Sequence, residues 1–390
     1  MQRDEGLDAI VDEVRRLVAF RPVTRGPNRD LIEDVSARLE AVGAACHLTW
    51  DDSKTKANLF ASFGPTDRPG VVLSGHTDVV PVDGQDWSSD PFAVVERDGK
   101  LFGRGTTDML GFLAVPIAMA EHIAARELRR PLHLALSYDE EIGCVGVRRL
   151  LAQLSSYAAT PAACIVGEPT NMGVVTGHKG KRVLRCSVRG RSGHSSRPED
   201  GVNAIERAAQ LIVRARTIAE RLIAEGPFEA GFDPPYTSMM TGTIRGGVMV
   251  NIVPEDCVFE LEIRFLPGDD PERLLSELRD YARERLEPEM RAVDPDAGFV
   301  FEEVLTYPAL STQAEADVVA LAQRLSGETT TGAVGFGTEA GLFALEGVPS
   351  VVCGPGGITE AHRPDEHVEL AQLARCRRFV EGLLDELSER

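Results

Sequence analysis

Continuous apolar runs that alternate with helical segments constrain the fold of this chain more than any other feature. The strand-like runs are NLFASFG, GVVLSGH, LHLALSY and ACIVG. Between and around them, apolar residues recur at helical spacing in segments 7–20, 30–42, 109–126 and 145–154. Strands of this kind, separated by helices, are typical of a sheet that is buried on both faces and largely parallel. We therefore expect an α/β fold with a mostly parallel central sheet covered by helices.

A second pattern begins near residue 181 and indicates an inserted lobe. The runs RVLRCSVRG and CVFELEIRF alternate apolar and polar residues, as strands with one solvated face do, and segments 201–224 and 271–286 read as helices. After about residue 295 the first pattern returns, with the strand PSVVCG and helices at 314–326, 338–345 and 367–388. We expect a catalytic domain formed by 1–180 and 294–390, and an α+β domain at 181–293 that serves in dimerisation and as a lid.

The charge balance restricts the partners of the chain. Its 61 Asp and Glu against 42 Lys and Arg give a formal net charge of −19, which repels the phosphates of nucleic acids and anionic membrane surfaces. We expect neither partner, and a cytoplasmic location, because the first residues are acidic where a signal peptide would be basic. The seven cysteines contain no CxxC pair, and Cys164 and Cys353 lie in apolar runs, so buried thiols are expected there and not nucleophiles.

Histidines and acids follow the predicted strands where each strand ends. VVLSGHTD carries His76 and Asp78, LALSYDEE carries Glu140 and Glu141, and CIVGEP carries Glu168. In open α/β sheets, side chains at the carboxyl ends of the strands meet in one crevice.

Two turns add further candidates for a metal site, Asp108 in GRGTTDMLG and His362 in ITEAHRPDE. Imidazoles and carboxylates without a thiolate suit Zn, Co or Mn. Any one of these residues alone would be an ordinary hydrogen-bonded histidine or a solvated acid, but so many acids at one crevice repel one another unless cations neutralise them.

These residues lie in motifs that resemble the two-metal, M20-type family of aminoacylases, desuccinylases and carboxypeptidases. The resemblance spans nearly the whole chain and is carried by SGHTDVVP, LFGRGTTDMLG, SYDEEIGCVG, VGEPT, GRSGHSSRPEDGVNAIE, EIRFLPG, GFGTEAGLF and GPGGITEAHRPDEHVE. The last two segments look most like the acetylornithine deacetylase branch. The resemblance implies hydrolysis of N-acetylornithine, a small N-acylated amino acid, to ornithine and acetate in arginine biosynthesis.

The family pattern also implies roles for the metal-site residues, and it implies two divalent ions, Zn before Co or Mn. His76 and Glu168 would hold one ion, Glu141 and His362 the other, and Asp108 would bridge both. Asp78 would accept the second ring N–H of His76.

The catalytic acids and bases follow from the same pattern. Glu140 would be the general base that takes a proton from water and returns it to the leaving amine. His194 would support the oxyanion, in its own subunit or across a homodimer formed by the inserted domain. Without the resemblance, an exposed loop histidine would be an equally good interpretation.

Substrate contacts are implied for a further group of residues. Arg264 and Asn251 resemble positions that hold the substrate carboxylate, to which Gly337 and Thr338 could add backbone N–H groups. For Glu339 the hypothesis is a contact with the side-chain amine of ornithine, and the alternative is a first-turn Glu that stabilises its own helix. The chain departs from the family at Leu110, where a Lys is usual, and this position is not among the implied ligands.

The sequence leaves three interpretations of the function open. The first is a metal-dependent amidohydrolase of the acetylornithine deacetylase branch. The second is a desuccinylase or a dipeptidase or carboxypeptidase of the same fold. The third is a catalytically inactive metal- or amino-acid-binding protein, which would not need Glu140 together with the complete ligand set.

Overall fold

The computed structural model describes residues 4–389, which form two compact units. Unit 1 contains the chain up to Gly177, Leu310–Ala333 and the chain from Thr338 onward, and unit 2 contains His178–Ala309 and Val334–Gly337. The expected boundary at residue 294 is wrong: unit 2 continues to Ala309, because strand β12 (Gly298–Tyr307) pairs with β9 (Gly180–Arg189) in unit 2.

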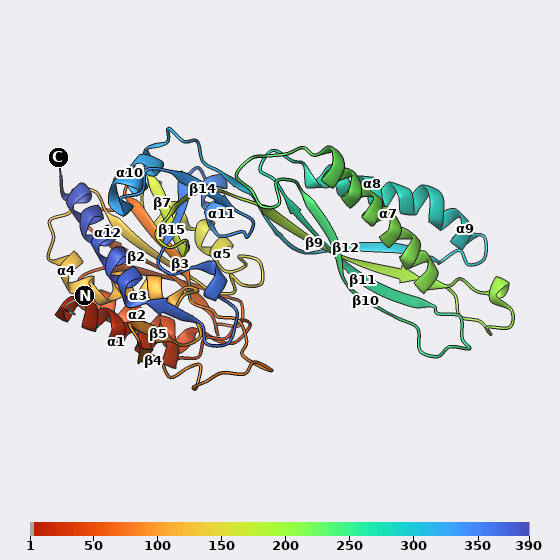
Figure 1. Ribbon diagram of the computed structural model, residues 1–390, viewed down its shortest axis with the longest axis horizontal. Helices are drawn as coiled ribbons and strands as arrows, with labels where there is room; N and C mark the ends of the chain where they lie inside the picture. The colour runs from red at the N-terminus through yellow and green to blue at the C-terminus, as the bar shows by residue number, and fades with distance from the viewer. Residues whose placement is uncertain (1–3, 390) are drawn as a thin grey trace. The chain divides into compact units, whose positions relative to one another are not determined.

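Unit 1 is built on a nine-stranded mixed sheet (Figure 1). The strand order is β1-β2-β6-β3-β7-β15-β8-β13, with β14 beside β8, and a small sheet β16-β5-β4 lies apart from it. The strands are β1 Ala45–Trp50, β2 Ala57–Phe63, β3 Val71–His76, β4 Val95–Arg97, β5 Lys100–Phe102, β6 Leu132–Ser137, β7 Ala163–Pro169, β8 Val174–His178, β13 Leu310–Ser311, β14 Thr331–Val334, β15 Ser350–Gly354 and β16 His367–Glu369.

The centre of this sheet is parallel, as the continuous apolar runs predict. β3 pairs in parallel with both β6 and β7, and β15 pairs in parallel with β7. Every residue of β3, β6, β7 and β15 is buried. The α/β class expected from the sequence is therefore confirmed.

Helices bury the sheet of unit 1, and their sequences show why. In α1 (Glu5–Ala19) the Asp4 side chain caps the first turn by accepting from the Leu7 N–H at 2.9 Å, and its apolar residues at helical spacing are buried. The other helices are α2 Arg29–Ala41, α3 Leu110–Ala118, α4 Ala120–Ala124, α5 Val147–Leu151, α6 Leu154–Tyr157, α10 Asp317–Ser326, α11 Ala340–Leu345 and α12 Leu370–Ser388, with a 3-10 turn at Ile358–Glu360.

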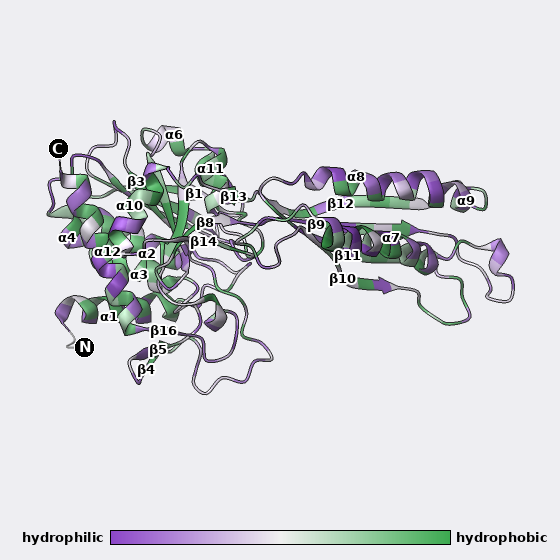
Figure 2. Ribbon diagram, turned by 45° about the horizontal axis from the view of Figure 1, so that its top comes forward, coloured by the Kyte–Doolittle hydropathy of each residue, from purple (hydrophilic) through white to green (hydrophobic). Residues whose placement is uncertain are grey.

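Unit 2 is an antiparallel sheet of order β10-β11-β9-β12 with its own hydrophobic core. β11 (Asp256–Phe265) alternates buried and more exposed residues, as its sequence predicts. The remaining elements are β10 Ser238–Gly246, α7 Ala204–Glu225, α8 Pro271–Tyr281, α9 Glu287–Arg291, a 3-10 turn at Pro198–Asp200 and a π-helical turn at Ala282–Leu286. Figure 2 shows hydrophobic and hydrophilic residues together along α7 and α8, in keeping with helices that bury one face against the sheet.

Among the residues that the structure describes, no helix is both long and apolar enough to span a bilayer. This finding agrees with the absence of long apolar runs in the sequence.

Candidate metal centre

The carboxyl ends of the parallel strands bring the predicted ligands of unit 1 together. His76 is the last residue of β3, Glu168 lies near the end of β7, and Glu141 stands in the turn after β6. Asp108 precedes α3, and His362 follows the 3-10 turn after β15. Residues separated by up to 286 positions therefore share one crevice, as the sheet topology requires.

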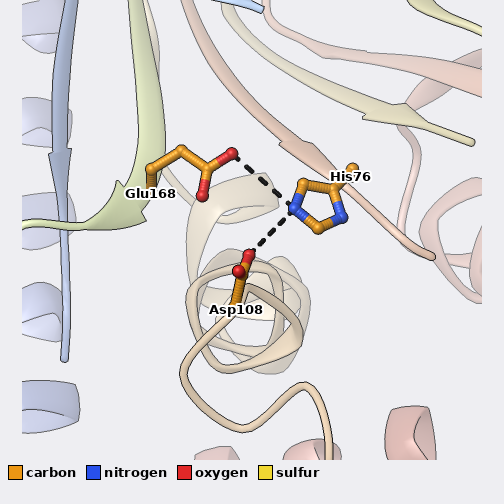
Figure 3. Close-up of side chains that lie close together, drawn as sticks. All are labelled: His76, Asp108 and Glu168. Atoms are coloured by element: carbon orange, nitrogen blue, oxygen red, sulfur yellow. Dashed lines mark hydrogen bonds and ion pairs between the residues drawn. The ribbon is translucent and has the colours of Figure 1, made fainter. Parts of the chain in front are cut away.

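One triad consists of His76, Asp108 and Glu168 (Figure 3). The Nε2 atom of His76 lies 3.0 Å from Asp108 Oδ1 and 3.6 Å from Glu168 Oε1. All three residues are buried. Tetrahedral ligands at about 2.1 Å from a zinc ion are separated by about 3.4 Å, so these spacings fit a single ion.

A second triad consists of Asp108, Glu141 and His362. The Nε2 atom of His362 lies 3.0 Å from Asp108 Oδ2 and 3.1 Å from Glu141 Oε2. Because Oδ1 of Asp108 faces the first triad and Oδ2 the second, this one carboxylate is placed as a bridge between two ion positions. The five residues inferred from the sequence thus form two groups that could each hold a divalent cation.

The electrostatics of the cluster also favour cations. Burial raises the pKa of Glu168 well above its ordinary value and also raises that of Glu141, and the charge of Asp108 adds to both shifts. Hydrogen bonds to Asp108 and Glu141 raise the pKa of His362 to about 10. For His76, desolvation is the largest effect and opposes the charged form, but the bond to Asp108 and the charges of the neighbouring acids together outweigh it and raise the pKa. Protonated imidazoles therefore compensate the acids here, a task that divalent ions would take over with the imidazoles neutral.

Glu140 has the environment expected of a general base. Its pKa is raised to about 8, mainly by burial, with the charge of Glu141 adding to the shift against an opposing effect of His76. The Cys144 thiol, which the sequence did not single out, donates to Glu140 Oε1 at 3.2 Å. Glu140 is adjacent to a candidate ligand but is not part of either triad.

The expected contact between the Asp78 carboxylate and His76 requires correction. The Nδ1–H of His76 donates to the backbone carbonyl of Asp78 at 2.8 Å, whereas the carboxylate oxygen lies 3.6 Å away. The carboxylate instead accepts from the backbone N–H groups of Glu140 at 3.0 Å and Glu141 at 3.3 Å, and from Thr24 Oγ1 at 3.0 Å. A carbonyl two residues along the chain fixes the ring as well as a carboxylate would, and this leaves the carboxylate free to hold the turn.

Glu339 does not have the surroundings expected of a contact to a substrate amine. Its carboxylate is 1% exposed and accepts hydrogen bonds from the hydroxyls of Ser74, at 3.0 Å, and Ser137. These serines belong to β3 and β6, so Glu339 joins the two strands beneath the cluster. The buried position and the two serine partners favour a structural role for Glu339 over the hypothesised contact with ornithine.

Thr338 and Gly337 have structural partners of their own. Within unit 1, the Thr338 hydroxyl is buried and accepts from the Ala340 N–H at 3.0 Å, which caps the start of α11. Within unit 2, a Cβ on Gly337 would lie 1.9 Å from the ring of Tyr307, so only glycine fits this position.

The other candidates for substrate contact belong to unit 2. The loop of His194 pairs with that of Asn251. The Ser195 N–H donates to the Asn251 carbonyl at 3.2 Å, and His194 and Ile252 form an isolated antiparallel β-bridge. Both His194 and Asn251 are exposed. Arg264 donates through Nε to Glu262 at 2.7 Å and is partly buried.

His194 is oriented by the residue two positions further along the chain. The backbone N–H of Ser196 donates to His194 Nδ1 at 3.1 Å. Nδ1 must then be the acceptor, so neutral His194 carries its proton on Nε2. An exposed Nε2–H is the kind of donor that an oxyanion requires.

Two buried charged residues lie in the quoted motifs but were not among the predicted site residues. Arg104 in GRGTTD and Glu366 in HRPDE are 1% and 0% exposed and pair with each other. Their signal is a charge within a glycine-bracketed or ligand-bearing turn, but nothing in the sequence shows that the two meet.

Comparison with known proteins agrees with this geometry. The sequence signature of the peptidase family M20/M25/M40 matches residues 72–386. The chain is 35% identical over 382 residues to the acetylornithine deacetylase of Myxococcus xanthus, with 95% of each chain covered, and 34% identical to that of Proteus mirabilis, with 97% of each covered.

Solved structures share the fold. An M20 family metallo-carboxypeptidase from Sulfolobus solfataricus superposes with a TM-score of 0.75 at 18% identity, covering 99% of this chain and 100% of the other. A Bacillus subtilis protein described as a dinuclear metal-binding peptidase of the M20 family superposes with a TM-score of 0.66 at 15% identity, with 97% of each chain covered. With the family signature over most of its length, the chain belongs to the peptidase family M20/M25/M40.

Proposed function

We propose that this protein is a metal-dependent amidohydrolase that removes the acetyl group from N-acetylornithine, releasing ornithine and acetate. The observation that carries the proposal is the pair of triads that share Asp108, with Glu140 beside them and outside both. The names of the curated relatives, at about 35% identity over most of the chain, support this substrate.

Two divalent ions fit the donor set, and zinc suits its imidazoles and carboxylates best, with cobalt or manganese as alternatives. His76 and Glu168 would hold one ion, Glu141 and His362 the other, and Asp108 both. When bound, such ions polarise the scissile carbonyl and lower the pKa of water.

The side chains of unit 1 then supply proton transfer. Glu140 accepts a proton from the attacking water and delivers it to the amine that leaves. The backbone of Glu140 is held by Asp78, and its carboxylate by the Cys144 thiol, so the base is fixed at both ends. A fixed base loses little orientational freedom on reaching the transition state.

Three residues of unit 2 complete the proposal. His194 Nε2–H donates to the developing oxyanion, whose stabilisation is commonly worth a factor of about a hundred to a thousand in rate. Arg264 and Asn251 bind the substrate carboxylate, for which a planar guanidinium is suited. Unit 2 is also the proposed dimerisation domain and lid, and His194 serves its own subunit or its partner.

The dimer is supported by the edge of the unit 2 sheet. β10 is an edge strand, and Ile244 and the following residues Val248, Met249 and Val250 are exposed apolar side chains. Sedimentation velocity tests this part: the protein should sediment as a dimer, and Val250→Glu, at a residue that is 99% exposed, should sediment as a monomer. A wild-type monomer would contradict the proposed dimer.

Hydrolysis assays with metal-stripped protein test the function. Free amine is measured from N-acetylornithine, from N-acetylated neutral amino acids, from N-succinyl-diaminopimelate and from a dipeptide, with and without added Zn²⁺ or Co²⁺. We expect metal-dependent turnover with acetylornithine preferred. Preference for another substrate would move the protein to the desuccinylase or dipeptidase activity of the fold, and no turnover with two ions bound would favour a binding protein.

A further inference from the structure

A fully buried ion pair lies behind the second triad. Arg104 Nη1 donates to Glu366 Oε2 at 2.6 Å, and the two side chains are 1% and 0% exposed. An isolated pair of this kind adds little stability, because removing both charges from water costs about as much as their attraction returns. Its remaining hydrogen bonds therefore indicate what the pair does.

The other oxygen of Glu366 holds the backbone that carries Asp108. Oε1 accepts from the N–H of Thr107 at 3.0 Å and from the N–H of Asp108 itself at 3.1 Å. Both oxygens of the Asp108 side chain face imidazoles, so a small rotation of this peptide would displace the bridge at both ion positions.

The second terminal nitrogen of Arg104, Nη2, is connected to His362 through Gln85. Arg104 Nη2 donates to Gln85 Oε1 at 2.5 Å, and Gln85 Nε2 donates to the backbone carbonyl of His362 at 3.0 Å. The Trp87 N–H also donates to Gln85 Oε1 at 3.0 Å, and the guanidinium carbon of Arg104 lies 5.0 Å from the centre of the Trp87 ring. The orientation of the Gln85 amide is thus determined by two donors.

His362 needs such support. Its φ of 62° lies in the left-handed region, which residues other than glycine rarely adopt, and its side chain is 50% exposed. The loop is also held at Asp365, whose carboxylate accepts from the Ser88 N–H and hydroxyl at 3.0 and 2.9 Å.

We propose that Glu366, Arg104 and Gln85 are positioning residues that set Asp108 and His362 at the spacing required to hold the second ion. None of the three belongs to either triad. The inference rests on the proposed function, in that it requires ions at the two triads, and it adds residues that act through the ligands without touching the ions.

The contacts predict different effects for two variants. Among the candidate ligands, Gln85 contacts only His362, so Gln85→Met should weaken the binding of the ion at Glu141 and His362 and leave the binding of the ion at His76 and Glu168 unchanged. Glu366→Gln should weaken the binding of both ions, because an amide cannot accept from Arg104 and from both backbone N–H groups at once. Loss of such outer partners typically lowers metal affinity by about 10- to 100-fold.

Zn²⁺ titration of metal-stripped full-length protein by calorimetry measures the two affinities, and Co²⁺ absorption in the visible range reports the geometry of each ion. The matched control is Glu13→Gln, which removes the charge of buried Glu13 in its pair with partly buried Arg38. The bonds of this pair are 2.5 and 2.7 Å long and involve no candidate ligand. We expect both Zn²⁺ affinities to be unchanged in the control. One affinity should fall in Gln85→Met, and both should fall in Glu366→Gln.

Two outcomes overturn the inference alone: wild-type affinity for both ions in Gln85→Met, or equal weakening in Glu13→Gln, which would mean a general loss of stability. If Glu366→Gln does not fold, Gln85→Met decides by itself, since Gln85 is partly exposed and lies outside helices and strands. Fewer than two ions bound by the wild type would overturn the proposed function, and the inference with it.

Discussion

The backbone N–H of Glu140 donates to the carboxylate of Asp78 at 3.0 Å, which ties the turn after β6 to the end of β3. A second oxygen of the same carboxylate accepts from the next peptide, at Glu141, and from Thr24. Asp78 therefore holds the proposed base and one proposed ligand, while its backbone carbonyl orients His76. One residue links three members of the site, each by a different atom.

Replacing Asp78 by Asn should impair catalysis more than metal binding. The amide retains one acceptor oxygen but turns an N–H toward another backbone N–H, so the Glu140 turn shifts while the carbonyl contact to His76 remains. We expect kcat to fall by about 10- to 100-fold, with the ion at His76 and Glu168 retained by calorimetry. Asp83→Asn, at an exposed position, is the control; loss of that ion at unchanged kcat would contradict the assignment.

Glu140→Gln should abolish proton transfer without disturbing the ions. A positioned general base contributes about 10²- to 10⁴-fold in rate, and Glu140 lies outside both triads. Steady-state kinetics should show this loss in kcat, while the variant binds two Zn²⁺ ions as the wild type does. An active variant, or one that binds fewer ions, would show that another residue is the base; exposed Glu127→Gln serves as the matched control.

Glu339→Gln should leave substrate preference unchanged. The carboxylate is buried, and each of its oxygens accepts from a serine hydroxyl, Ser74 or Ser137. The ratio of kcat/KM for N-acetylornithine to that for a neutral N-acetyl amino acid should stay within about threefold, since no charged contact to substrate is lost. A much larger change in this ratio would restore the contact that the structure argues against.

Stability should fall in mild acid because of His133. Burial lowers the pKa of His133 to about 4, whereas the unfolded chain titrates near 6.5. Between these pH values the unfolded state binds a proton that the folded state does not. The contribution of neutral His133 to the free energy of unfolding is therefore fully present above pH 6.5 and is lost as the pH falls toward 4. About 1 kcal/mol should disappear between pH 7.5 and 5.5.

Urea unfolding at the two pH values tests this expectation. His133→Asn, which keeps a polar group toward Ser62 but does not titrate, should show a smaller loss by that amount. His122→Asn, at an exposed residue, should behave as the wild type. Identical pH dependence in all three proteins would refute the role of His133.

The sequence predicts the two triads because each ligand follows an apolar strand or stands in a glycine-rich turn, and parallel strands end at one edge. It does not predict Glu366 beneath Asp108, since their contact joins positions 258 residues apart. Nor does it predict that the ring of His76 bonds to the carbonyl of Asp78, at 2.8 Å, and not to its carboxylate, at 3.6 Å, because residue spacing does not contain such small differences in position. The boundary at 294 failed because the pairing of β12 with β9 is a long-range contact.

The most direct test of the account is a crystal structure of the zinc-loaded protein with anomalous data at the zinc edge. We predict two peaks about 3.5–4 Å apart, as in other two-metal sites, one against His76 and Glu168, the other against Glu141 and His362, with an Asp108 oxygen on each. One peak, or two peaks without Asp108 between them, would contradict the two-metal centre.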